Sequence, residues 1–259
     1  MPSPSGVITF TTDFGAGWYA GAMKGAALRV NPRATLVDLT HGVSPMNVLE
    51  GAFSLAAACG AFPEGAVHVA VIDPGVGTTR RALVIETDRY FFVGPDNGVL
   101  TLAAPQPLCK RAFAIEDARF FGPERSATFH GRDIFSPVAA HLASGADPAE
   151  MGPPAGEPVA LGLPEVLREG EDRLGEIVLR DAFGNLITNI PGDQLKGRSR
   201  AEVWLEDRKI GPLRNSYGEA AAGEALALIG SHGYLEIAVS GGSAGRSLGE
   251  GPGGKVRVK

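Results

Sequence analysis

Short apolar runs alternate with Ala-rich segments along the first half of the chain. The run at 66–72 is apolar almost throughout, which is typical of a strand covered on both faces. Strands that alternate with helices favour βαβ units and a mainly parallel sheet. The sequence therefore predicts an α/β domain, with strands at 6–12, 34–39, 66–72, 82–86 and 90–93 and helices at 18–30, 47–59 and 134–143.

The pattern changes after residue 145. Five prolines and little periodicity between 145 and 170 are typical of a linker. Beyond it, short strand-like runs separated by Gly-rich turns predict a small barrel or sandwich, with strands at 175–179, 186–190, 201–205, 225–229, 234–239 and 255–258. The predicted organisation is an α/β domain at 1–150, a linker at 151–172 and an all-β domain at 173–259.

Composition and charge narrow the functional classes. The 259 residues are 44% hydrophobic and 20% charged, a balance that excludes a disordered chain, and the net charge of −5 argues against nucleic-acid binding. Cys59 and Cys109 stand far apart without Cys/His ligand spacing, so we expect reduced thiols and no metal site. The N-terminus lacks a signal pattern, and the charge-free stretch at 51–63 is shorter than the roughly 18–20 residues of a membrane span. We expect a cytoplasmic protein.

Three polar clusters in the first half are candidates for chemistry. Asp13 and Asp73 directly follow the first and third predicted strands, and ligands of open α/β sheets bind beyond such strand ends. Asp13 could accept hydrogen bonds from a vicinal diol or cap the following helix, and Asp73 could act in a site or shape an Asp-Pro-Gly turn. His130, followed by Arg132 and Asp133, could be an oriented base or a helix cap.

A fourth cluster lies in the second half. Phe183 and Asn185 offer an aromatic face and a two-sided amide, which suit a purine, with the carboxylate of Asp181 beside them. The same residues could equally form a β-turn. Two familiar patterns are accidental: the G-x-S-x-G around Ser243 has no downstream His, and the Gly-rich stretch at 249–255 is followed by neither Ser/Thr nor a helix.

In this order the clusters resemble the S-adenosylmethionine (SAM) hydroxide adenosyltransferases, whose relatives include fluorinating and chlorinating enzymes. The resemblance implies an α/β N-terminal domain with a β-barrel-like C-terminal domain. It also implies a homotrimer, with each site between the N-terminal domain of one subunit and the C-terminal domain of the next. Nine segments carry it: TTDFG (11–15), MKG (23–25), DLTHGVSP (38–45), EGAF (50–53), DPGVGTTR (73–80), VGPDNGVL (93–100), TFHGRDIFSPVAAHLA (128–143), FGNLITNI (183–190) and GYLEIAV (233–239).

The activity implied by the resemblance is hydrolysis of SAM to adenosine and L-methionine by in-line attack of water or hydroxide at the ribose 5′ carbon. The family's water-handling triad corresponds to Asp73, Arg80 and His130. No cofactor or metal is implied, because the leaving group is a neutral thioether and one aligned, activated water suffices.

The resemblance also assigns the substrate contacts. Asp13 corresponds to the carboxylate that binds the ribose diol, and Met46 stands where halogenating members have Trp beside the ribose or sulfonium. The remaining assignments are adenine contacts by Phe183, Asn185, Val239 and Gly241, and methionine contacts by Asp181 and Ser231. Position 232 is His where halogenating members carry Arg.

Two other functions remain open: a SAM-dependent halogenase and a non-catalytic adenosyl-binding protein. Halogenating relatives carry Tyr-Ser where this chain has His130-Gly131, and Tyr or a similar residue in place of Asp73. A carboxylate within about 4 Å of a halide would repel it, which favours water as the nucleophile.

Overall fold

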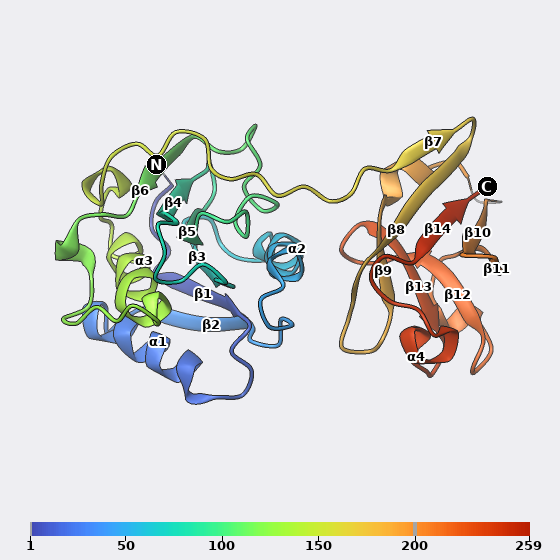
Figure 1. Cartoon of the computed structure of the whole chain (residues 1–259), viewed down its shortest axis with the longest axis horizontal. Helices are drawn as coiled ribbons and strands as arrows, with labels where there is room; N and C mark the ends of the chain where they lie inside the picture. The colour runs from blue at the N-terminus through green and yellow to red at the C-terminus, as the bar shows by residue number, and fades with distance from the viewer. Residues whose placement is uncertain (1, 199–200) are drawn as a thin grey trace. The chain divides into compact units, whose positions relative to one another are not determined.

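The computed structural model describes residues 2–198 and 201–259. The chain divides between Gly162 and Leu163 into two compact units (Figure 1). The segment 151–172, predicted as a linker, includes this boundary and also a short strand, β7 (Leu167–Glu169).

The first unit contains a mainly parallel sheet, as the sequence predicts. Within the described residues its strand order is β2-β1-β3-β5-β4-β6. Strand β4 runs antiparallel to the other five, which all point the same way. The edge strand β6 was not predicted. The strands are β1 (Val7–Thr12), β2 (Thr35–Thr40), β3 (Val67–Val71), β4 (Ala82–Glu86), β5 (Phe91–Pro95) and β6 (Arg111–Ala114).

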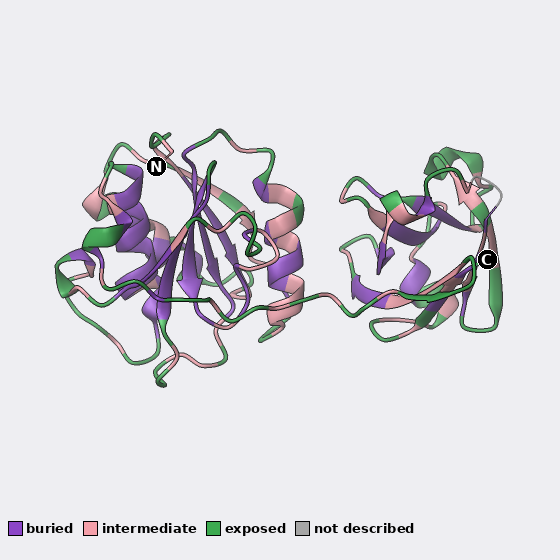
Figure 2. Ribbon diagram, turned by 90° about the horizontal axis from the view of Figure 1, so that it is seen from above, coloured by how far each residue is buried: buried purple, intermediate pink, exposed green. Residues whose placement is uncertain are grey.

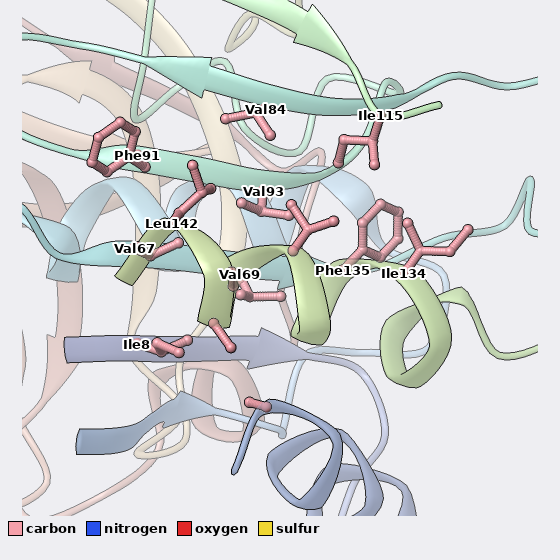
Figure 3. Close-up of a cluster of buried hydrophobic side chains, with 14 of the residues drawn as sticks. Ile8, Val67, Val69, Val84, Phe91, Val93, Ile115, Ile134, Phe135 and Leu142 are labelled. Carbon is pink, nitrogen blue, oxygen red and sulfur yellow. The ribbon is translucent and has the colours of Figure 1, made fainter. Parts of the chain in front are cut away.

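Helices cover both faces of this sheet, and its strands other than the edge strand β2 are largely buried between them (Figure 2). Helices α1 (Trp18–Val30) and α3 (Ser136–Ala143) pack on one face, and α2 (Val48–Cys59) packs on the other. Alternate residues of β3 enter the two cores, which explains its nearly uninterrupted apolar run. Figure 3 shows the α1/α3 side of the core.

The last helix of the first unit differs from the prediction at its start. A π-helical turn, η2 (Gly131–Phe135), precedes α3, and the hydroxyl of Ser136 donates to the carbonyl of Gly131 at 2.7 Å. Helical structure thus begins directly after His130. Short 3-10 turns occur at η1 (Ala118–Phe120), η3 (Pro148–Glu150), η4 (Gly192–Leu195) and η5 (Tyr217–Glu219).

The second unit is a β-barrel. Its strands follow the order β14-β10-β11-β12-β13-β9-β8, and β14 also pairs with β8, which closes a ring of seven among the described residues. This closure decides between the barrel and sandwich that the sequence left open; β7 adds to β8 as a hairpin. The strands are β8 (Asp172–Arg180), β9 (Leu186–Pro191), β10 (Glu202–Leu205), β11 (Arg208–Arg214), β12 (Ala225–Ile229), β13 (Tyr234–Val239) and β14 (Lys255–Val258).

Two elements of the barrel escaped prediction. Strand β11 has the sequence RKIGPLR, in which charges, Gly and Pro hide the alternation of a strand. The short helix α4 (Ala244–Leu248) lies in a Gly- and Ser-rich segment. No helix in the described part of the chain is long and apolar enough to cross a membrane.

Candidate functional site

The ends of two neighbouring strands bring two carboxylates together in the first unit. Strands β1 and β3 are parallel, with Thr12 paired to Val71, so Asp13 and Asp73 emerge at the same edge of the sheet. Both line a pocket of about 390 Å³ together with His130. Three aromatic residues and a thioether form much of its remaining wall: Phe14, Tyr19, Phe129 and Met46.

Arg80 connects Asp73 to His130 and is not among the residues that line the pocket. Its Nε donates to both carboxylate oxygens of Asp73, at 3.0 and 3.1 Å, and its Nη2 pairs with Asp73 and lies 2.8 Å from Nδ1 of His130. The guanidinium also lies over the ring of Phe135, 5.3 Å from its centroid. One planar fork therefore fixes the orientation of the two side chains that reach the pocket.

These contacts determine the protonation of His130. A guanidinium has only N–H donors, so Nδ1 of His130 must accept, and the proton of the neutral ring is on Nε2. Burial lowers the pKa of His130, and the charge of Arg80 lowers it further, against a smaller opposing effect of Asp73. The imidazole is therefore neutral near pH 7.

Close packing of two loops places His130 beside the Asp73 turn. Gly77 has φ of +77° and lies against the carbonyl of Ala127, where a Cβ would collide with the backbone. Asp73 accepts a backbone hydrogen bond from Val76 at 3.2 Å, so it is both a turn residue and a pocket residue. His130 precedes η2 without a side-chain capping bond.

Asp13 does not cap α1, whose N-cap is Gly17. Instead its Oδ2 accepts the backbone N–H of Met46 at 2.8 Å. Met46 has φ of +63°, unusual for a residue other than glycine, and its side chain is 70% exposed. The carboxylate thereby holds the loop after β2 against the pocket.

The two charged residues that follow Gly131, Arg132 and Asp133, bind each other. Arg132 donates from Nε to Asp133 at 2.6 Å, and Asp133 accepts the backbone N–H of Ser126 at 2.8 Å. Among the described residues, no three His, Cys, Asp or Glu side chains gather in a way that could hold a metal ion.

The second unit has its own open pocket, of about 800 Å³. Phe183, Asn185, Val239 and Gly241 all line it, so the structure brings together the four residues assigned to adenine. The ring of Phe183 is 79% exposed. An exposed aromatic face beside an amide is a suitable surface for a flat heterocycle.

Asp181 is engaged in the turn between β8 and β9. Its Oδ1 accepts the backbone N–H groups of Phe183 and Asn185 at 2.9 and 2.8 Å, and its Oδ2 accepts the Asn185 amide at 3.0 Å. The β-turn interpretation is therefore correct for Asp181, which does not line the pocket.

Ser231 lies away from the residues assigned to adenine. It precedes β13, whereas Val239 and Gly241 are at the other end of that strand, roughly 20 Å away at 3.3 Å per residue. Ser231 is exposed in the turn between β12 and β13 and is not part of the pocket.

Sequence reasoning missed two features of this pocket. Tyr217 lines it, and its hydroxyl donates to Oε1 of the buried Glu236 at 2.7 Å; burial and this carboxylate raise the pKa of Tyr217 to about 12. No local pattern marks Tyr217, which lies in an irregular segment. Ser243 also lines the pocket and accepts the N–H of Arg246 as the N-cap of α4, so the G-x-S-x-G match is a helix start.

Comparisons with known proteins agree over both units. Models of the SAM hydroxide adenosyltransferase N-terminal and C-terminal domains match residues 8–152 and 175–257. A protein of Salinispora tropica named (R)-S-adenosyl-L-methionine hydrolase is 40% identical over 99% of this chain and 98% of its own. A fluorinase of Actinoplanes is 26% identical over 90% of each chain. The crystal structure of an uncharacterized conserved protein from Thermotoga maritima aligns with a TM-score of 0.90 and 37% identity, covering 97% of this chain and 99% of that one.

Proposed function

Because the chain belongs to the SAM hydroxide adenosyltransferase family, we propose that it hydrolyses SAM to adenosine and L-methionine by attack of water at the 5′ carbon. The observation that carries the proposal is the Asp73–Arg80–His130 group, which presents a carboxylate and an imidazole N–H to one pocket beside Asp13. The Salinispora relative is named for the (R) epimer at sulfur, and we propose that epimer as the substrate of this chain as well.

The chemistry needs little from the protein beyond a positioned, activated water. The C5′–O bond forms as the C5′–S bond breaks, and the electron pair of the broken bond goes to sulfur. The leaving group is the neutral thioether of methionine, so no general acid is required. The water loses one proton, and solvent finally takes it.

The three side chains divide this work. Asp73 accepts the proton of the water, since its carboxylate has acceptor capacity and lines the pocket. His130 carries its proton on Nε2 and donates it in a hydrogen bond that orients the attacking oxygen. Arg80 does not touch the water; it fixes both partners through its fork.

Recognition of the substrate is divided between the two pockets. Asp13 accepts from the ribose diol and Met46 packs beside the ribose, while the adenine lies on Phe183 with Asn185 and the backbone near Val239 and Gly241. Asp181 and Ser231 are assigned to the methionine end. We propose a homotrimer in which the first-unit pocket of one subunit meets the second-unit pocket of a neighbour, supported by the open adenine pocket and the exposed ring of Phe183.

The free thiols Cys59 and Cys109 support a reducing, cytoplasmic location.

The test of the function is chromatography of the purified protein incubated with each SAM epimer in oxygen-18 water, with and without chloride. Adenosine and methionine in equal amounts, with the label on the 5′ oxygen, are expected from the (R) epimer. A 5′-chloro-5′-deoxyadenosine product would assign the chain to the halogenating branch. Binding without product would leave an adenosyl-binding protein.

The pH dependence follows from the neutral state of His130. Protonation would place a proton on Nδ1, facing the guanidinium of Arg80, and would break the bond that orients the ring. Burial and Arg80 hold the pKa of His130 below its ordinary 6.5. We therefore expect kcat to fall toward low pH with a midpoint below pH 6.5. A profile of kcat against pH with its acid midpoint above 6.5 would contradict this assignment.

A further inference from the structure

Strand β1 carries two Thr–His pairs with the same geometry in different surroundings. Thr9 and His68 pair in the core, with Oγ1 2.8 Å from Nδ1, and burial lowers the pKa of His68 to about 4. Thr12 and His41 pair at the end of the strand, also at 2.8 Å, next to Asp13. Only the second pair adjoins the pocket.

Hydrogen-bond directions are fixed in the Thr12–His41 pair. Nε2 of His41 lies 3.0 Å from Oδ1 of Asp38, and a carboxylate can only accept, so the proton of the neutral ring is on Nε2. Nδ1 then accepts the proton of the Thr12 hydroxyl, whose oxygen accepts the backbone N–H of Phe14 at 3.2 Å. The other oxygen of Asp38 accepts from Lys24 at 2.8 Å, so the series ends at a surface cation.

These contacts fasten the turn that carries Asp13 at two points. The side chain of His41 holds Thr12, which precedes Asp13, and its carbonyl accepts the backbone N–H of Gly15 at 2.7 Å. Asp13 and Phe14, between these two points, line the pocket, whereas Thr12 and His41 do not.

We propose that His41 is a positioning residue that sets the Asp13 carboxylate for the ribose diol through Thr12. This inference rests on the proposed function. Thr12 is fully buried and is not a nucleophile, although the order of Asp38, His41 and Thr12 is that of a hydrolase triad. These contacts instead order the 12–15 turn before the substrate binds, so that binding does not cost this conformational entropy.

The experiment compares KM and kcat for SAM in the full-length protein and its variants. His41→Ala and Thr12→Val should each raise KM about tenfold, the effect of losing one positioned hydrogen bond, with kcat changed about twofold or less. The double variant should match the single ones, because both remove the same contact. His41→Asn should restore most of the affinity, since its amide oxygen can accept the Thr12 proton in place of Nδ1.

Thr9→Val is the matched control, because it removes the same kind of contact from the core pair. It should lower the melting temperature and leave KM unchanged. In an Asp13→Ala background, His41→Ala should have no further effect on KM. If His41→Ala and Thr12→Val behave like Thr9→Val, or if their effects on KM persist without Asp13, the proposal is wrong.

Failure of the proposed function gives a different result. If the wild type turns over no SAM, the same variants are compared by calorimetry for binding of adenosine and of 2′,3′-dideoxyadenosine. A positioning role predicts that His41→Ala weakens adenosine binding about tenfold and does not change binding of the dideoxy compound. Equal losses for both ligands would overturn it.

Discussion

Replacing Asp73 with Asn should reduce kcat for SAM hydrolysis by about 100-fold or more and change KM about threefold or less. The amide keeps the size of the side chain and can still accept from Arg80, but it cannot take the proton of the attacking water. Binding depends on groups at other atoms of the substrate, so KM is insensitive. Initial rates of adenosine formation, measured by chromatography across SAM concentrations, separate the two constants.

Asp96, which is held by Arg81, provides the control for this variant. Asp96 is also a buried carboxylate held by an arginine, with Nε of Arg81 2.8 Å from its Oδ2, and it accepts the backbone N–H of Val159 at 2.7 Å. It does not line the pocket with Asp73. Asp96→Asn should therefore cost stability and leave kcat within about threefold of the wild type. Equal losses of kcat in both variants would show that Asp73 supports the fold and does not accept the proton.

The position of the first pocket was predictable because parallel strands have a fixed geometry. Asp13 and Asp73 each follow an apolar strand, and the carboxyl ends of adjacent parallel strands share an edge. What the sequence left open was the local function of each carboxylate. Asp13 does not cap a helix, because its carboxylate accepts the backbone N–H of Met46, a residue 33 positions away.

Features that depend on irregular segments were not predictable. Tyr217 reaches the pocket of the second unit from a 3-10 turn. Its partner, Glu236, has the position of a solvent-facing residue in an alternating strand. Its burial follows from the segment that folds over the outer face of β12 and β13, where Ala220 packs on Leu226 and Ala238. Closure of the barrel likewise depends on β14 meeting β8, a pairing between residues about 80 positions apart.

Separation in sequence also made the contacts among Asp73, Arg80 and His130 unpredictable. Arg80 is seven residues from Asp73 and fifty from His130, and sequence order cannot tell which of the three stands between the others. In the structure the arginine is the bridge. This makes Nδ1 of the imidazole an acceptor, which supports the proposal that the carboxylate takes the proton of the water.

Arg80→Lys should lower kcat about 100-fold even though the charge is kept. A single ammonium cannot reproduce three bonds to Asp73 and a fourth to Nδ1 of His130, so one of the two groups loses its orientation. Arg81→Lys, the same exchange one residue later, weakens the pair with Asp96 and should leave kcat within about threefold. An equal loss in both variants would argue for a general sensitivity of this loop.

The pH profile separates the geometry of Arg80 from its charge. In Arg80→Lys the cation remains beside His130, so the acid limb of kcat should stay below pH 6.5, as in the wild type. In Arg80→Gln the second-largest cause of the lowered pKa of His130 is gone, so this pKa rises toward its ordinary value and the acid limb moves to higher pH. Both variants are slow, but only the second changes its pH dependence. If the limb moves in neither variant, the group that titrates is not next to Arg80. If it moves equally in both, the contacts of Arg80 set the pKa of His130 and its charge does not.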